Sequence, residues 1–364
     1  MQIEIKKNKT KNVNSKAISA LLGVFGVLII SAAAVGVLLG IRLKSDTYDS
    51  LFNVPKINII DTRPAVTDNP AVTQTPYVKT ISYNGKTYTK NEGIVNLLFL
   101  GIDSNAERRE KNKGYRSDMV MVCAVDTVAQ TATLLSIPRD TYTTMYKVDR
   151  SGAVEGTVQA KINAAYAYAG NEYRAANSMA CVQMFLQREC ELAEPLGFTL
   201  DIPVSLYASI DMDGISKVAS AVGGVEVTLD ATIPDVGRKG KTVLLKGSNA
   251  EEYIRNRHDT AGGDITRASR QRTFMLSLAK KIKNMGGVDI ILSLYDELQR
   301  YVKTNLNTDH MLDFAKLLKK IKIDDIKQVS VSGKSKRING SSVIVHDEKE
   351  TLELLLDIYY IQVQ

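Results

Sequence analysis

The chain has 364 residues, of which 44% are hydrophobic, and it carries a formal net charge of +7 with a pI near 9.0. Its length and apolar content are sufficient for a substantial core. The first 16 residues hold five lysines and one glutamate, so they supply +4 of the net charge and leave only +3 for the rest. Such a small excess gives little support to nucleic-acid binding, and we exclude that class of function.

An apolar segment dominates the N-terminal region. Residues 17–41 contain no charged side chain, and a run of this length spans a bilayer as a helix. A cleaved signal peptide, the alternative, has a shorter apolar core. Because lysines are concentrated in residues 1–16, the positive-inside bias favours a cytoplasmic N-terminus. We predict a cytoplasmic tail over 1–16, one transmembrane helix over 17–41, and an extracytoplasmic remainder at the cell membrane.

Residues 42–90 are predicted to form an extracytoplasmic stalk that ends in a hairpin. Four of the eight prolines lie here among many Thr, Asn and Asp residues, without a sustained period, as is typical of an extended linker. The stretch ISYNGKTYTK then alternates around Asn84-Gly85, a pair favoured in two-residue β-hairpin turns. A single globular domain is predicted over residues 91–364.

The domain alternates between strand and helix patterns. Apolar runs with little alternation predict strands within IVNLLFLG, MVMVCAVD and TATLLSIP, which begin at residues 94, 119 and 131, and such runs are typical of strands covered on both faces. Helices are predicted over 160–170, 176–190, 213–224 and 264–283, followed by two amphipathic helices after residue 287, a short strand over 327–333 and a last helix near 347–360. This order predicts an α/β class, arranged as an α/β/α sandwich.

Three cysteines are too few for a disulfide framework in a chain of this length. Cys123 lies in an apolar strand pattern, which predicts a buried thiol. Pairing of Cys181 with Cys190 is left open.

The stretch YIRNRHDTAGGDITRASRQR, residues 253–272, is unusually rich in arginine. In its second half, a helical period places Arg267 and Gln271 on the apolar stripe, with Arg270 and Arg272 to either side and expected in solvent. In its first half, a capping box in SNAE (248–251) predicts a short helix over about 249–255. Arg255 and Arg257 would therefore project from a helix end and the loop that follows.

A buried guanidinium needs an anionic partner, because an unpaired charge in the interior is too costly. An internal salt bridge to an acid is one possibility for Arg267. A loop pair of arginines that faces a helical arginine favours the other, a pocket for a multiply anionic ligand.

Strand ends supply further polar side chains. Arg139 and Asp140 directly follow one predicted strand, Arg116 and Asp118 precede another, and Asp103 lies at the carboxyl end of a third. In open α/β sheets ligands bind at that edge. Asp103 and Asp118 have the hard oxygen ligands of a Mg²⁺ site shared with phosphate, and guanidinium groups match phosphate oxygens. These features together favour a pyrophosphate, although no nucleotide-binding glycine motif is present.

Six motifs, in order, resemble those of the LytR-CpsA-Psr family of membrane-anchored bacterial cell-wall transferases. They are NLLFLGID (96–103), RSDMVMV (116–122), SIPRD (136–140), KINAAYAYAG (161–170), AVGGVEV (221–227) and YIRNRHD…GDITRASRQR (253–272). The resemblance implies an α/β/α sandwich with a central mixed sheet and a lipid pocket between sheet and helices. The chain departs from the family pattern in GSNAEEY, which replaces a more apolar approach to the arginine pair.

The resemblance also implies an activity. A glycopolymer would be transferred from a polyprenyl-pyrophosphate carrier to peptidoglycan as a phosphodiester, with release of polyprenyl phosphate. By motif position, Asp103 and Asp118 would bind Mg²⁺, and Arg116, Asp118 and Arg139 would be catalytic. The pyrophosphate would be bound by Arg116, Arg139, Lys161, Arg255, Arg257, Arg267 and Gln271.

Two other functions remain open on the sequence alone. With water as the acceptor, the same site would be a polyprenyl-pyrophosphate phosphatase. Without turnover, the protein would be a lipid-binding regulatory anchor protein, although two aspartates beside the arginines are not needed for simple anion capture. Asp118 is the first choice of general base, but metal binding alone is the preferred role for it.

Overall fold

The computed structural model describes residues 47–54, 77–78, 80–103, 115–170, 172–187, 199–256, 301–322 and 325–363, and single residues or pairs between 270 and 281. The predicted transmembrane helix over 17–41 lies outside the described residues. No helix within the described ranges has both the length and the apolar character needed to cross a membrane.

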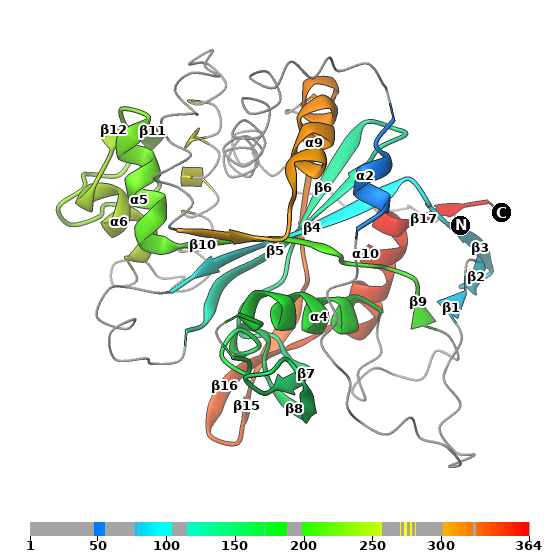
Figure 1. Cartoon of the computed structure of the whole chain (residues 1–364). Coiled ribbons are helices and arrows are strands. Elements are labelled where there is room, and N and C mark those ends of the chain that lie inside the picture. The colour runs from blue at the N-terminus through cyan, green and yellow to red at the C-terminus, as the bar shows by residue number, and fades with distance from the viewer. Residues whose placement is uncertain are drawn as a thin grey trace, which may run out of the picture.

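A mixed sheet forms the centre of the described part of the chain (Figure 1). Its strands are, in spatial order, β13 (Val302–Thr304), β10 (Leu206–Asp211), β4 (Ile94–Ile102), β5 (Ser117–Asp126), β6 (Thr131–Ser136) and β14 (Lys327–Ser330). The pairs β10 with β4 and β6 with β14 are parallel, and the other three pairs are antiparallel. The strands predicted from the apolar runs are confirmed as β4, β5 and β6, and the short one as β14.

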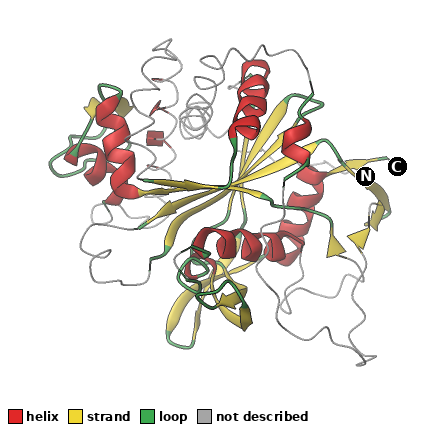
Figure 2. Cartoon of the chain, in the orientation of Figure 1, coloured by secondary structure: helices red, strands yellow, loops and turns green. Residues whose placement is uncertain are grey.

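Helices cover both faces of this sheet, as Figure 2 shows. Leu97 and Phe99 of β4 join the core beneath α2 (Asp49–Phe52), α5 (Met212–Ala221), α6 (Ser248–Arg255) and α9 (Thr308–Lys320). Leu98 and Leu100 point to the other face, beneath α4 (Arg174–Gln187) and α10 (Glu348–Tyr359). Successive side chains of a strand alternate between faces, and both faces here are buried. The strands therefore read as continuous apolar runs.

Smaller strand pairs surround the central sheet. The predicted hairpin is confirmed as β2 (Thr80–Tyr83) and β3 (Lys86–Lys90), with positive φ at Asn84 (51°) and Gly85 (72°), and β17 (Tyr360–Gln362) pairs with β3. The other pairs are β7 (Tyr142–Val148) with β8 (Val154–Lys161), β11 (Val225–Thr228) with β12 (Thr242–Leu245), β15 (Gly333–Ile338) with β16 (Ser341–His346), and β1 (Tyr77–Val78) with β9 (Thr199–Leu200).

The helix predicted over 160–170 is wrong. Lys161 ends β8, and a short 3-10 helix, η2 (Ile162–Ala164), and turns follow. The backbone here bonds to other elements, because Val148 donates to the carbonyl of Tyr168 (2.8 Å) and the amide of Asn177 donates to that of Ala165 (2.8 Å). These tertiary bonds override the helix propensity of the alanines.

Part of the predicted stalk packs on the domain. Leu51 of α2 is 2% exposed in the core, and the Ser50 hydroxyl donates to Asp313 of α9 (2.6 Å). The Lys320 ammonium group lies 5.8 Å from the centre of the Tyr48 ring. Residues 47–54 are therefore held on α9 by apolar and polar contacts.

The cysteine predictions have separate outcomes. Cys123 is buried, as predicted, and burial raises the pKa of its thiol. Cys181 is a free, buried thiol, whereas Cys190 lies outside the described residues.

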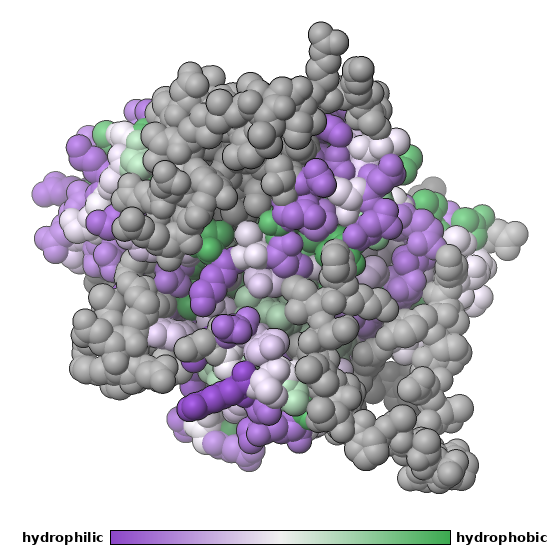
Figure 3. Space-filling model, in the orientation of Figure 1, coloured by the Kyte–Doolittle hydropathy of each residue, from purple (hydrophilic) through white to green (hydrophobic). Residues whose placement is uncertain are grey.

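On the face drawn in Figure 3, the described surface is mainly hydrophilic, with scattered hydrophobic residues.

Candidate functional site

The two predicted metal ligands lie at one edge of the central sheet. Asp103 directly follows β4, and its N–H donates to the carbonyl of Arg116 (3.0 Å). Gly101 pairs with Met119, but Ile102 pairs with Ser117, which leaves Asp118 as an extra residue in β5. A β-bulge of this kind redirects side chains and is frequent beside active sites.

A chain of alternating charges continues from Asp118. Its Oδ1 lies 2.9 Å from Nη1 of Arg139, and Nε of Arg139 lies 3.8 Å from Oδ2 of Asp140. The other oxygen of Asp140 lies 2.8 Å from Nζ of Lys161. The side chains of Asp118 and Arg139 are only 8% and 18% exposed, so water screens this pair weakly.

Main-chain bonds hold the two cations together. Arg139 follows β6, and Lys161 ends β8. The carbonyl of Arg139 accepts from the N–H of Asn163 (3.2 Å), and the carbonyl of Thr141 accepts from the N–H of Ile162 (2.8 Å). Three segments far apart in the sequence thereby contribute Asp118, Arg139 and Lys161 to one cluster.

Arg255 is the last residue of α6, where the predicted helix was expected to end. The predicted capping box is wrong, because Gly247 is the N-cap, with a φ of 55°, and no side chain caps the helix. Nε of Arg255 lies 3.3 Å from Oε1 of Glu251. Because α6 packs on α5, which directly follows β10 beside β4, it lies at the end of the sheet where Asp103 follows β4 (Figure 1).

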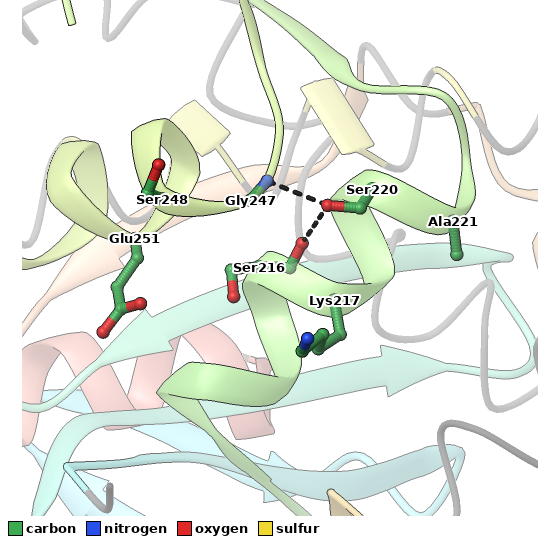
Figure 4. A pocket seen from close by; sticks show the side chains of 7 residues that line it. All are labelled: Ser216, Lys217, Ser220, Ala221, Gly247, Ser248 and Glu251. Atoms are coloured by element: carbon green, nitrogen blue, oxygen red, sulfur yellow. Dashed lines mark hydrogen bonds between the residues drawn. The ribbon is translucent and has the colours of Figure 1, made fainter.

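A polar groove of about 490 Å³ lies between α5 and α6 (Figure 4). It is lined by Ser216, Lys217, Ser220, Ala221, Gly247, Ser248 and Glu251. The Ser220 hydroxyl links the two sides of the groove. It donates to the Ser216 carbonyl of α5 (3.0 Å) and accepts from the N–H of Gly247, the N-cap of α6 (2.8 Å). Glu251 both lines the groove and pairs with Arg255, so the groove opens beside that arginine.

A family model described as the LytR_cpsA_psr family matches residues 65–357 of this chain. The chain belongs to the LytR-CpsA-Psr family. The family resemblance seen in the six sequence motifs is thus confirmed over four-fifths of the chain.

Two named proteins and one solved structure are similar to this chain over most of its length. A Bacillus cereus (strain AH820) protein named polyisoprenyl-teichoic acid--peptidoglycan teichoic acid transferase TagU is 33% identical over 64% of this chain and 67% of its own length. An Enterococcus faecalis protein of the same name is 31% identical over 71% of this chain and 77% of its own. The crystal structure of B. subtilis TagV superposes with a TM-score of 0.54 and a sequence identity of 25%. The match covers 73% of this chain and 95% of that one.

The structure describes only part of the set expected from LytR-CpsA-Psr motifs. Asp103, Asp118, Arg139 and Lys161 come together at the sheet edge, with Arg116 exposed beside Asp118. Arg255 contributes from α6. The remaining members, Arg257, Arg267 and Gln271, lie outside the described residues, so their place in the site stays a prediction. For Arg139 and Arg255 the structure shows ion pairs with internal acids.

The donor set fits a magnesium ion. Mg²⁺ in proteins is usually bound by one or two carboxylates together with substrate phosphates and water. Asp103 and Asp118 supply two carboxylates at one edge. Among the described residues, no cluster of three or more His, Cys, Asp or Glu side chains could form an all-protein metal site.

Sequence patterns missed two arginines near the site. Arg270, expected in solvent, is 0% exposed. That prediction is wrong because the helical wheel considered only the apolar stripe and not the cover provided by the end of α6. The guanidinium of Arg174, at the start of α4, lies 4.7 Å from the centre of the Tyr115 ring. Tyr115 is the residue that precedes Arg116 in the sequence. No local pattern identifies either residue.

Tyr166, two residues after η2, packs in the core on the face of the sheet that α4 and α10 cover. It is buried, and burial raises its pKa to about 12. Its hydroxyl bonds to the Ser209 side chain, and the charge of Arg174 opposes the upward pKa shift. Tyr166 therefore stays neutral near pH 7 and serves as a packing group.

Proposed function

We propose that the protein attaches a glycopolymer from a polyprenyl-pyrophosphate carrier to peptidoglycan through a phosphodiester, with release of polyprenyl phosphate. The main observation in support is that four charged residues lie together at one sheet edge: Asp103, Asp118, Arg139 and Lys161. The printed names of the relatives, which describe transfer of teichoic acid from a polyisoprenyl carrier to peptidoglycan, support this assignment.

The cations bind and orient the diphosphate. Guanidinium groups present forked donors that match two phosphate oxygens, and Lys161 adds a point charge. The proposed ligands are Arg116, Arg139, Lys161, Arg255, Arg257, Arg267 and Gln271. Asp103 and Asp118 would hold Mg²⁺, which neutralises phosphate charge when bound.

The reaction is a displacement at the phosphorus that carries the glycopolymer. A muramic acid hydroxyl attacks this phosphorus and loses its proton to solvent, the bond from phosphorus to the bridging oxygen breaks, and polyprenyl phosphate leaves with the electron pair of that bond. Fixed positive charge stabilises the developing negative charge. Asp118 is a poor choice of base for the hydroxyl proton, because its Oδ1 is already engaged by Arg139 at 2.9 Å and its carboxylate is a proposed ligand of Mg²⁺. We therefore assign Asp118 to the metal and to Arg139.

The predicted anchor fits this substrate. If residues 17–41 span the cell membrane, the enzyme and its lipid-linked donor share one surface, and their effective concentration rises. The catalytic domain then lies outside the cell, where peptidoglycan is. Both the anchor and this location are part of the proposal.

A reconstituted transfer assay tests the proposal. The full chain in detergent would receive a lipid-linked glycopolymer, Mg²⁺ and peptidoglycan oligomers, and polyprenyl phosphate and the phosphodiester product would be measured. Asp103→Ala and Arg255→Ala are each expected to slow transfer about 10²-fold or more, whereas the control Arg238→Ala, at an exposed arginine, retains it. Full activity in both site variants refutes the site. Equal release of polyprenyl phosphate without acceptor would identify a phosphatase instead.

A further inference from the structure

Arg270 contacts the backbone between the two arginines of the RNR sequence. It is fully buried, and its Nη2 donates to the carbonyl of Asn256. Asn256 is the C-cap of α6 and lies between Arg255 and Arg257 in the chain. The buried guanidinium is therefore attached to the one peptide segment that joins the two predicted phosphate ligands.

Asn256 is held from the helix side as well. Its N–H donates to the carbonyl of Glu252 (2.9 Å), and its side-chain amide donates to the carboxylate of Glu252 (2.7 Å). Asn256 lies at the C-terminal end of α6, where the helix dipole is negative and a cation is favourable. Arg270 completes the set of contacts that fixes the chain direction at the end of α6.

An apolar contact holds the two helical segments together. Tyr253 of α6 and Phe274, one turn beyond Arg270, are both buried, and their ring centres are 6.5 Å apart. Burial raises the pKa of Tyr253, and the positive charge of Arg270 opposes that shift. These aromatic rings supply the packing, so the guanidinium is not needed for the contact itself.

The buried guanidinium of Arg270 is expected to destabilise the fold, which argues against a purely structural role. Within the described part of the chain, Nε and Nη1 of Arg270 are buried without a hydrogen-bond partner. Buried donors without partners destabilise a fold, and buried ion pairs replaced by well-packed apolar residues of similar volume often leave stability unchanged or higher.

From these contacts we propose that Arg270 is a positioning residue for the pyrophosphate site. It fixes the carbonyl of Asn256, the residue after Arg255, and so sets the direction in which the Arg255 side chain leaves the end of α6 towards the diphosphate. Its own buried positive charge adds to the attraction for the anion. This inference rests on the proposed function and adds a residue that does not itself touch the substrate.

Three variants of the full-length protein test it. Arg270→Met removes charge and donors at similar size, Arg270→Lys keeps the charge and one donor, and Arg238→Met is a control for net charge at an exposed arginine. Binding of farnesyl pyrophosphate with Mg²⁺ would be measured by calorimetry, and Tm by thermal unfolding. We expect Arg270→Met to keep or raise Tm but weaken binding at least tenfold. Arg270→Lys should recover most of the affinity, and the control should match wild type.

The outcomes separate the possible roles of Arg270. Wild-type affinity in Arg270→Met overturns the inference alone. If Met lowers both Tm and affinity, recovery of both by Lys supports positioning, whereas recovery of Tm without affinity, or of neither, overturns it. Wild-type protein that fails to bind the probe contradicts the proposed function itself.

Discussion

Replacement of Asp118 by asparagine should weaken the fold before any substrate is present. The change keeps the shape of the side chain and removes the charge that faces Arg139 at 2.9 Å. Breaking a buried ion pair typically costs about 3–5 kcal/mol, because the remaining charge is left unpaired. Arg139 is 18% exposed and also faces Asp140 at 3.8 Å, so we expect a loss of about 2–3 kcal/mol in the free energy of unfolding.

Urea unfolding without Mg²⁺ measures this loss. The midpoint should fall while the m value stays constant, because the surface exposed on unfolding does not change. Asp357→Asn is the matched control, since Asp357 and its partner Lys327 are 68% and 67% exposed and such pairs contribute little. Combined with Arg139→Met, the Asp118 change should show a coupling energy of about 0.5–3 kcal/mol. A loss no larger than that of the control, or additive effects in the double variant, would refute the reasoning.

Addition of Mg²⁺ tests the second role of Asp118. A ligand present at a hundred times its Kd stabilises the folded state by about 2.7 kcal/mol. The wild-type protein should therefore gain stability in MgCl₂, and Asp118→Asn should gain less. Equal gains would show that Asp118 does not bind the ion.

Three further predictions concern the stability of the domain. Tyr359→Phe should lower the free energy of unfolding by about 1–3 kcal/mol, because the Tyr359 hydroxyl donates to the buried Asn96 amide oxygen (2.9 Å); urea unfolding measures it, and an unchanged midpoint contradicts it. Leu51→Ala should cost about 2–5 kcal/mol if residues 47–54 are part of the fold, and calorimetry should show a lower Tm. Burial lowers the pKa of His310 below 6.5, so the unfolded chain is protonated first, and stability should fall as pH drops below about 6.5. His310→Gln should flatten that dependence, and an identical Tm profile between pH 5 and 8 would contradict it.

The central sheet was predictable because its strands are covered on both faces. In β4 and β5 nearly every residue is apolar, and this pattern indicates a buried strand whatever its partners are. Strand order was not predictable, because β10 and β14 pair in parallel with strands far away in sequence. The β7 and β8 hairpin was missed for a related reason. Its polar and small residues alternate weakly, and tertiary hydrogen bonds determine its course.

The candidate site was predictable in its composition but not in its geometry. Acids and arginines directly after or before apolar strands reveal which side chains lie at the sheet edge, and this identified Asp103, Asp118 and Arg139. The bulge at Asp118 depends on register between β4 and β5, which no local pattern encodes. The burial of Arg270 depends on contact with α6 across 14 residues of chain, and a helical wheel contains no information on such a contact.

The alternation of charge explains how a cation-rich site can exist before its substrate binds. Several guanidinium and ammonium groups gathered at one sheet edge would repel one another, and the repulsion would be strong where water is excluded. Asp118 and Asp140 lie between Arg139 and Lys161 and offset that repulsion. In the proposed function, a pyrophosphate that arrives with a divalent ion would replace the acids at the cations, and the ion would serve as the counterion of Asp118. The net charge of the cluster would change little in this exchange, so substrate binding would not restore the repulsion that the acids offset.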